Sequence, residues 1–267
     1  ALDNSPAALI AEWKQLAAEG RKNVSNYRCR EIATLLSQSD PKMLQVMLDL
    51  IADPKASGES KSVAAYSLEL FVTQDMLPFL TPLTAPDRDA NTRVCAAHLL
   101  ASSHLTENEP TFRALKDDPD RRVQLAALVG LVGIGDGDAR GKLVAWYHRP
   151  DATAVEKTRI LTSVLLVAPT KEDTPLLASA IEDPDSTPFV RFYATMALAR
   201  IADASVIPAM RRAREREKVA EISEAMDAAI ATLEAMGPAP AGGSVAGAEA
   251  SAGPVPSLAS PGGTPQG

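Results

Sequence analysis

The chain has 267 residues, of which 46% are hydrophobic and 23% are charged, and this composition predicts a folded protein with a sizeable core. Lys and Arg total 27 against 34 Asp and Glu, which gives a formal net charge of −7, and aromatic residues make up only 4%. An acidic chain with few aromatic residues lacks the surface that grips phosphates and stacks on bases, so we expect no nucleic-acid partner.

The cysteines, the apolar runs and the first residues exclude further classes. Cys29 and Cys95 are too few for a disulfide framework and are expected to be small buried residues. No apolar run approaches the roughly 20 residues of a membrane helix. The chain starts at Ala1 without a basic segment or an apolar signal core. This start favours an exported protein whose signal peptide has been removed, and a cytoplasmic protein with a trimmed start is the alternative.

Helical patterns follow one another along the chain, and no alternating apolar and polar run predicts a strand. Ser5 and Pro6 provide an N-cap and a first helical position, and Gly20 ends the first helix. The fold class is therefore all-α. Seven helical hairpins are predicted, at 5–19 with 23–37, 41–52 with 60–72, 75–82 with 89–103, 108–117 with 120–134, 138–148 with 153–168, 171–182 with 187–202, and 204–216 with 218–236.

The composition changes abruptly at Gly237. Residues 237–267 hold 6 Pro, 8 Gly and a single charged residue, Glu249. A segment of this kind buries too little apolar surface to order itself. We therefore expect a folded region over 1–236 and a disordered tail rich in Ala, Gly, Pro and Ser over 237–267.

An internal repeat lies within the helical region. The segment that starts at Asp118 returns at Asp183, so that Val123 aligns with Val190. Both copies run Asp-Pro-Asp, then a Val next to an Arg, then an Ala-rich helix, and looser copies precede them. The anchors are 29 to 35 residues apart, which is one helical hairpin per repeat.

This pattern, clearest at 118–134 and 183–201, resembles the HEAT and HEAT-like (bilin-lyase type) repeats. The resemblance implies a right-handed α-solenoid of about seven hairpins, in which stacked neighbours bury the apolar faces. It also implies a concave surface lined by the second helix of each pair.

The resemblance gives a structural role to a series of charged residues. In HEAT-like repeats an Asp in the turn and an Arg in the second helix pair between neighbouring repeats, and such Arg–carboxylate pairs fix the register of packed units. The alternative is a ridge of arginines that grips an acidic partner. The expected ladder consists of Asp89, Arg93, Asp120, Arg122, Asp151, Arg159, Asp185 and Arg191.

The sequence contains no complete motif for catalysis or for metal binding. The loop 135–142 fits neither a phosphate-binding loop nor a calcium loop, because the required glycine and acidic residues are missing. Cys95 and His98 are three residues apart but lack further ligands at useful spacing. No metal, no cofactor and no catalytic residue is therefore predicted.

The resulting prediction is a non-catalytic scaffold or adaptor, not an enzyme, that binds another protein on its concave face and acts as a monomer. The residues that bind this partner are unknown. The alternative is an enzyme of the HEAT-like class, either a bilin lyase or a DNA glycosylase. A glycosylase would need a basic concave face, which the net charge opposes.

Overall fold

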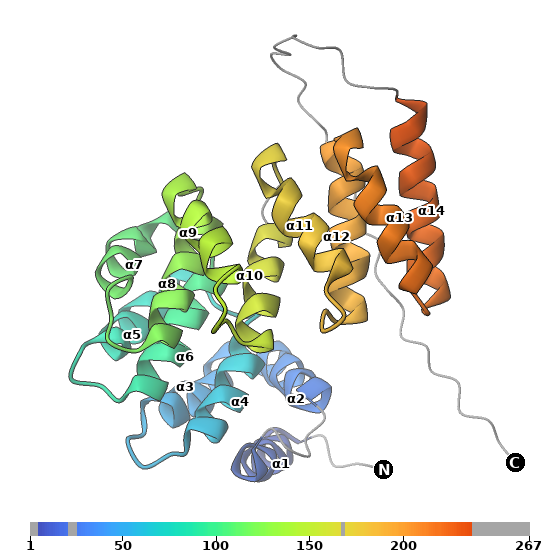
Figure 1. Cartoon of the computed structure of the whole chain (residues 1–267). Coiled ribbons are helices and arrows are strands. Elements are labelled where there is room, and N and C mark those ends of the chain that lie inside the picture. The colour runs from blue at the N-terminus through green and yellow to red at the C-terminus, as the bar shows by residue number, and fades with distance from the viewer. Residues whose placement is uncertain (1–4, 21–25, 167–168, 237–267) are drawn as a thin grey trace, which may run out of the picture.

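The computed structural model describes residues 5–20, 26–166 and 169–236, and within these ranges fourteen α-helices and short 3-10 turns occur without any strand (Figure 1). The helices form seven successive antiparallel pairs. The prediction of an all-α solenoid of seven hairpins is thereby confirmed. The predicted tail lies outside the described residues.

Each pair contributes one helix to each of two layers. The first helices are α1 (Pro6–Glu19), α3 (Gln45–Ala52), α5 (Leu77–Leu80), α7 (Glu109–Leu115), α9 (Gly137–Tyr147), α11 (Thr174–Glu182) and α13 (Ile207–Arg216). The second helices are α2 (Asn26–Ser39), α4 (Gly58–Leu68), α6 (Ala90–Ser102), α8 (Arg121–Gly133), α10 (Ala154–Leu166), α12 (Pro188–Ile201) and α14 (Ala220–Ala235). The second helices pack on one another in succession from α2 to α14, and they form one continuous layer.

Polar caps fix where the second helices begin. Ser57, Asp89, Asp120 and Thr187 each accept a hydrogen bond from a backbone N–H in the first turn of the helix that follows. These side chains satisfy donors that a helix leaves unpaired at its N-terminus. The observed starts of α6, α8 and α12 lie within two residues of the predicted ones for the same reason.

Small residues let the second helices approach each other closely. Ala96 and Ala97 of α6, and Ala126 and Ala127 of α8, are completely buried in adjoining helices. The same helix α8 lacks a side chain at Gly130, where an added Cβ would lie 2.4 Å from the ring of Phe112 in α7. The alanines and this glycine therefore set the spacing of the layers.

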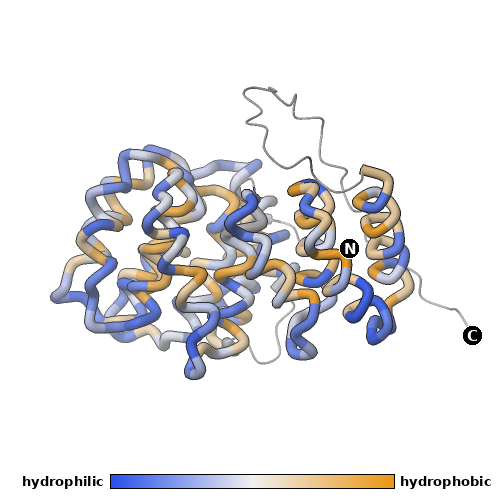
Figure 2. The backbone as a smooth tube through the Cα atoms, turned by 45° about the horizontal axis from the view of Figure 1, so that its top comes forward, coloured by the Kyte–Doolittle hydropathy of each residue, from blue (hydrophilic) through white to orange (hydrophobic). Residues whose placement is uncertain are grey.

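The core runs through the whole stack. Trp13 of α1 is fully buried and its indole N–H donates to the hydroxyl of Ser67 at 3.0 Å. Cys29 and Cys95 are buried free thiols, as expected. Hydrophobic segments lie mainly within the helices and hydrophilic ones mainly at the hairpin turns (Figure 2). Among the described residues, no helix combines the length and the apolar character that a membrane crossing needs.

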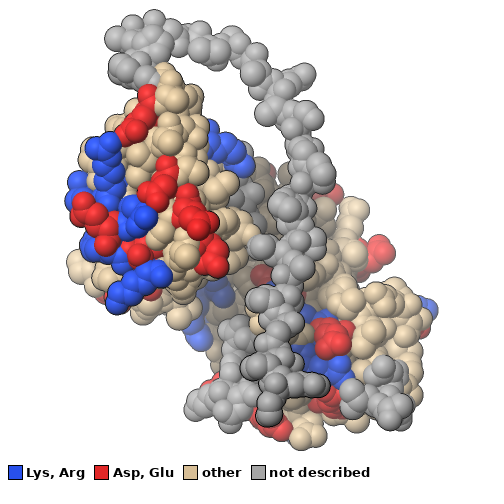
Figure 3. All heavy atoms as spheres, turned by 90° about the vertical axis from the view of Figure 1, so that its right-hand side faces the viewer, with Lys and Arg blue, Asp and Glu red and all other residues tan. Residues whose placement is uncertain are grey.

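The C-terminal end of the stack presents mixed charges. Arginines of α13 pair with acidic residues of α11 and α14, including Arg214 with Asp227 at 2.9 Å and Arg212 with Glu182 at 2.7 Å. Figure 3 views the molecule from this end and shows Lys and Arg interspersed with Asp and Glu. A polar outer face of this kind keeps a terminal repeat from exposing a core surface.

Candidate ligand-binding groove

The layer of second helices bends so strongly that helices three repeats apart share one hollow. Ser62 of α4 and Arg159 of α10 line the same hollow, although α6 and α8 lie between their helices. The hollow has a volume of about 500 Å³. Because the second helices meet across the bend, they form its inner, concave face, and we call this hollow the inner groove.

Aliphatic and arginine side chains together line the inner groove. The aliphatic ones are Val94, Leu125 and Val155, of which Leu125 is buried and Val155 is 75% exposed. The arginines are Arg121 and Arg122 at the start of α8 and Arg159 on α10. The groove therefore offers an apolar wall with guanidinium groups beside it.

The repeat register explains these positions. Val94 and Leu125 each lie five residues after a capping aspartate, Asp89 and Asp120. Arg122 lies two residues after Asp120, and positions two and five of a helix are neighbours on the same face. The hairpin repeat therefore turns the same face of each second helix towards the groove.

Acidic residues hold two of the arginines in place. Arg121 pairs with Asp151 at 3.0 Å and with Glu156 at 2.9 Å, whose carboxylate also accepts from the backbone N–H of Thr153 at 2.8 Å. Arg122 pairs with Asp120 at 2.7 Å. This hydrogen bond holds the pKa of Asp120 below its ordinary value.

Glu69, at the end of α4, contacts basic side chains from two other helices on the inner face. Its carboxylate lies 3.4 Å from His98 Nε2 and pairs with Arg30 of α2, whose guanidinium also stacks over the ring of Tyr66 at 3.7 Å. Burial alone would raise the pKa of Glu69, but the hydrogen bond with His98 and the charges of Arg30 and Arg159 lower it overall. Glu69 is therefore a carboxylate that links α4 to α2 and α6.

The groups of this cluster are poorly placed for catalysis. His98 Nε2 faces Glu69, and His98 Nδ1 is buried without a hydrogen-bond partner, so neither nitrogen is presented to the inner groove. Burial raises the pKa of the Cys95 thiol to about 11, which keeps it protonated and unreactive at neutral pH. We assign the cluster to the packing of the inner face.

A ladder of ion pairs joins successive repeats. Its basic residues lie four positions after the cap of a second helix, and each pairs with an acidic residue of the next repeat. The pairs are Lys61–Asp89 at 2.8 Å, Arg93–Asp118 at 2.9 Å, Lys157–Asp183 at 3.5 Å and Arg191–Glu217 at 2.6 Å. Gln124 holds this position in α8 and donates to the backbone carbonyl of Asp118 at 2.7 Å.

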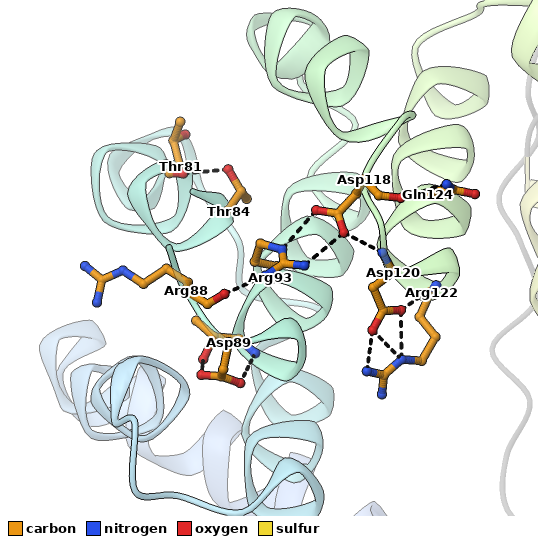
Figure 4. A network of polar contacts seen from close by, with 10 residues as sticks. Thr81, Thr84, Arg88, Asp89, Arg93, Asp118, Asp120, Arg122 and Gln124 are labelled. Atoms are coloured by element: carbon orange, nitrogen blue, oxygen red, sulfur yellow. Dashed lines mark hydrogen bonds and ion pairs between the residues drawn. The ribbon is translucent and has the colours of Figure 1, made fainter. Parts of the chain in front are cut away.

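Three of the residues predicted for a ladder belong to the ion-pair ladder that the structure shows. Asp89, Arg93 and Arg191 lie in it, but Arg93 pairs with Asp118 and not with Asp120 (Figure 4). The Arg93 guanidinium makes two parallel bonds of 2.9 Å to Asp118, and both side chains are almost fully buried. This is the bidentate geometry that gives Arg–carboxylate pairs their strength.

The remaining predicted residues make other contacts. Arg122 pairs with Asp120 of its own turn, and Asp151 pairs with Arg121 and Arg149. Asp185 donates its backbone N–H to Asp183, and Arg159 lines the inner groove. The reason is helical geometry, because Arg122 lies two residues after its cap whereas Arg93 lies four. A difference of two residues turns a side chain by about 200° around a helix.

No metal site is evident in the part of the chain that the structure describes. No three His, Cys, Asp or Glu side chains in these ranges lie close enough together to hold a metal ion. The glycine-rich loop at 135–142 provides the start of α9, where the Asp136 side chain caps the helix through the N–H of Ala139 at 2.9 Å.

Comparisons with known proteins include a weak likeness to a solved structure. No protein-family model matches the chain, and no curated protein matches it. Among solved structures, human deoxyhypusine hydroxylase in complex with glycerol is similar, with a TM-score of 0.38 and 15% identity over 86% of this chain and 93% of that one.

This finding corrects the prediction that the chain is a non-catalytic scaffold and not an enzyme. The solved structure named above is that of a hydroxylase, which is an enzyme and not a non-catalytic scaffold. The likeness is too distant to give this chain an activity, a substrate or a catalytic residue.

Proposed function

We propose that the inner groove binds a small organic anion that has an apolar portion. The observation that carries the proposal is the convergence of three arginines, Arg121, Arg122 and Arg159, in a hollow of about 500 Å³, beside an aliphatic wall on which Val155 is exposed. Binding sites for small molecules combine such apolar walls with a few charged groups that orient the ligand.

The charges of the lining favour an anion over a cation. The lining holds three arginines and two acidic residues, Asp120 and Glu156, so it has a small positive excess, although Arg121 also pairs with Asp151 outside the lining. Both acids are already engaged, Asp120 by Arg122 and Glu156 by Arg121. A cation would have to compete with these arginines, whereas a carboxylate or sulfonate adds an acceptor to them.

The aliphatic wall favours a ligand with an apolar body. Val155 is 75% exposed on the wall of a concave surface, and covering such a side chain contributes about 1–2 kcal/mol. A fully hydrated ion such as phosphate would gain nothing from this wall. An alkyl or aryl anion would use the wall and the arginines together.

The test uses two ligands with equal chains and opposite charges. The full-length protein is titrated with anilinonaphthalene sulfonate, an aryl anion whose fluorescence rises in apolar surroundings, and the bound dye is then displaced. We expect decanoate to displace it at least about tenfold more strongly than decyltrimethylammonium, which corresponds to about 1.4 kcal/mol. Equal displacement by both would contradict the proposal. Recovery of the decanoate by mass spectrometry shows in the same sample whether the protein converts it.

We further propose that the repeats are of the HEAT-like class, that the protein acts as a monomer, and that the ion-pair ladder fixes the register between repeats. The class rests on the repeated sequence pattern at 118–134 and 183–201. The role of the ladder is supported by its recurrence at one position in four of the second helices. Light scattering at several concentrations tests the monomer.

A further inference from the structure

Helix α12 exposes an apolar stripe. Phe189 is 56% exposed and Met196 is 50% exposed, and Tyr193 lies between them on the same face. The rings of Phe189 and Tyr193 are 4.6 Å apart with a 46° tilt, and Phe192 stands edge-on to Tyr193 at 5.5 Å. Large apolar side chains grouped in this way on a surface usually mark a binding site.

The repeat itself does not require this stripe. Phe189 lies two residues after its cap, and Asn91 and Arg122 hold that position in α6 and α8. Met196 lies nine residues after the cap, where α6 has His98. A polar side chain occurs at each of these positions in at least one other second helix, although α10 has Val155 at the first and α8 has Val129 at the second, so the fold does not require the apolar stripe of α12.

The sequence of the same chain contains a segment of matching chemistry. Residues 237–267 carry one charge, and within them Pro254, Val255, Pro256 and Leu258 form the most apolar stretch. Proline-rich segments dock on exposed aromatic side chains because their extended conformation is largely preformed and costs little entropy to fix. An uncharged occupant also suits a stripe that has no charged residue between Phe189 and Met196 other than Arg191, which pairs with Glu217.

The segment is tethered within reach of the stripe. The tail begins directly after α14, and α14 packs against α12. Seventeen residues, 237–253, separate Met236 from Pro254. A linker of this length spans at most about 60 Å and has an average end-to-end distance of about 23 Å when flexible. Such a tether gives an effective concentration in the millimolar range, so that even a weak contact is populated.

We propose that residues 254–258 of the tail dock on the stripe formed by Phe189, Tyr193 and Met196. The chain thereby covers its own exposed aromatic surface, at the C-terminal end of the inner face. The occupant is a segment of the same molecule, and the proposal does not depend on the inner groove.

The test places a nitroxide at Ser260→Cys in the full-length protein and observes methyl-labelled methionines by NMR. The native Cys29 and Cys95 are buried, so the new thiol is the one that reacts. We expect the Met196 methyl signal to be broadened at least about threefold more than that of Met76 in the N-terminal half, because docking holds the label close.

A matched control separates docking from tethering. The same labelled protein with Val255→Asp and Leu258→Asp keeps the tether length and removes the apolar contact. We expect the Met196 signal to recover in this variant, and equal broadening in both proteins would overturn the proposal. Phe189→Ala with Tyr193→Ala, on the exposed side of α12, should restore the signal as well.

A second copy of the chain is the competing occupant. If light scattering of the full-length protein detects a dimer that Phe189→Ala abolishes, and Met196 is not broadened within one molecule, the stripe is an interface between copies and the tail proposal is wrong.

Discussion

The pair between Arg93 and Asp118 should carry more stability than any exposed ion pair of the molecule. Both side chains are almost fully buried, with 9% and 6% exposure, and they are joined by two bonds of 2.9 Å. Asp118 also accepts the backbone N–H of Asp120 at 2.8 Å, and Arg93 donates to the carbonyl of Arg88 at 2.5 Å. Removing either partner leaves a charge in a site that water hardly reaches.

The magnitude follows from that burial. Replacing one member of a buried ion pair costs about 3–5 kcal/mol, because the other charge loses its compensation. We expect Arg93→Met and Asp118→Asn each to destabilise the protein within that range. The double variant should cost less than the sum of the two by about 1–3 kcal/mol, since neither charge is then left alone.

Urea unfolding followed by far-UV circular dichroism measures these changes. Arg122→Met is the control, because the Arg122–Asp120 pair has a half-exposed guanidinium and should contribute at most about 1 kcal/mol. If Arg93→Met costs no more than Arg122→Met, or if the two losses are simply additive, the pair does not fix the contact between these repeats.

Three further predictions concern packing, backbone strain and charge. Gly130→Ala should destabilise the protein by about 1–3 kcal/mol, because the added Cβ would lie 2.4 Å from Phe112. Gly141→Ala should stabilise the protein by about 0.5–1 kcal/mol, because this residue lies inside α9 with nothing within 4 Å of an added Cβ. Thermal unfolding that moves both variants in the same direction would refute this account. Ala202 ends α12 with a left-handed φ of 59°, so Ala202→Gly should raise the melting temperature slightly, and a lower one would show that this turn carries no strain. The lowered pKa of Glu69 means that its carboxylate adds stability above the ordinary carboxyl pKa of about 4.3, and that this stability disappears as the pH falls through the lowered value. The difference in unfolding free energy between the protein and Glu69→Gln should therefore shrink as the pH falls below about 4.3, and a difference that persists unchanged from pH 5 to pH 3 would contradict it.

The helices could be predicted from local signals. Asp89, Asp120 and Thr187 are strong N-caps, and Ala-rich stretches follow each of them, so the starts of α6, α8 and α12 could be placed closely. These signals act over a few residues and do not depend on the neighbouring repeat. The seven-hairpin solenoid follows from their repetition.

The sequence allowed the prediction that Arg and Asp side chains pair between repeats, but not which helix positions supply them. Alignment of Arg122 with Arg93 treats residues two and four positions after the cap as equivalent, although they point to opposite sides of the helix. Lys61 is not among the predicted ladder residues because a lysine is rarely buried, whereas it lies beside Asp89 with only 1% exposure. A count from the capping residue would have identified both.

The inner groove could not be predicted from the sequence. Ser62 and Arg159 are almost a hundred residues apart, and they meet because each repeat adds a small rotation to the stack. Local sequence patterns do not specify the sum of these rotations. Arg159 was expected in the ladder, whereas it lines the inner groove and its charge helps to lower the pKa of Glu69.

The binding of an apolar anion in the inner groove is the central claim, and the affinity for decanoate in matched variants tests it most directly. Val155→Asp adds a negative charge to the groove, and Leu70→Asp makes the same change at a similarly exposed aliphatic residue outside it. Arg159→Gln removes a positive charge from the groove, and Arg211→Gln removes one from α13. Calorimetric titration should show affinity at least about tenfold weaker for the two groove variants and unchanged for the two controls. If all four variants bind decanoate as the unaltered protein does, the inner groove is not the binding site and the proposed function is wrong.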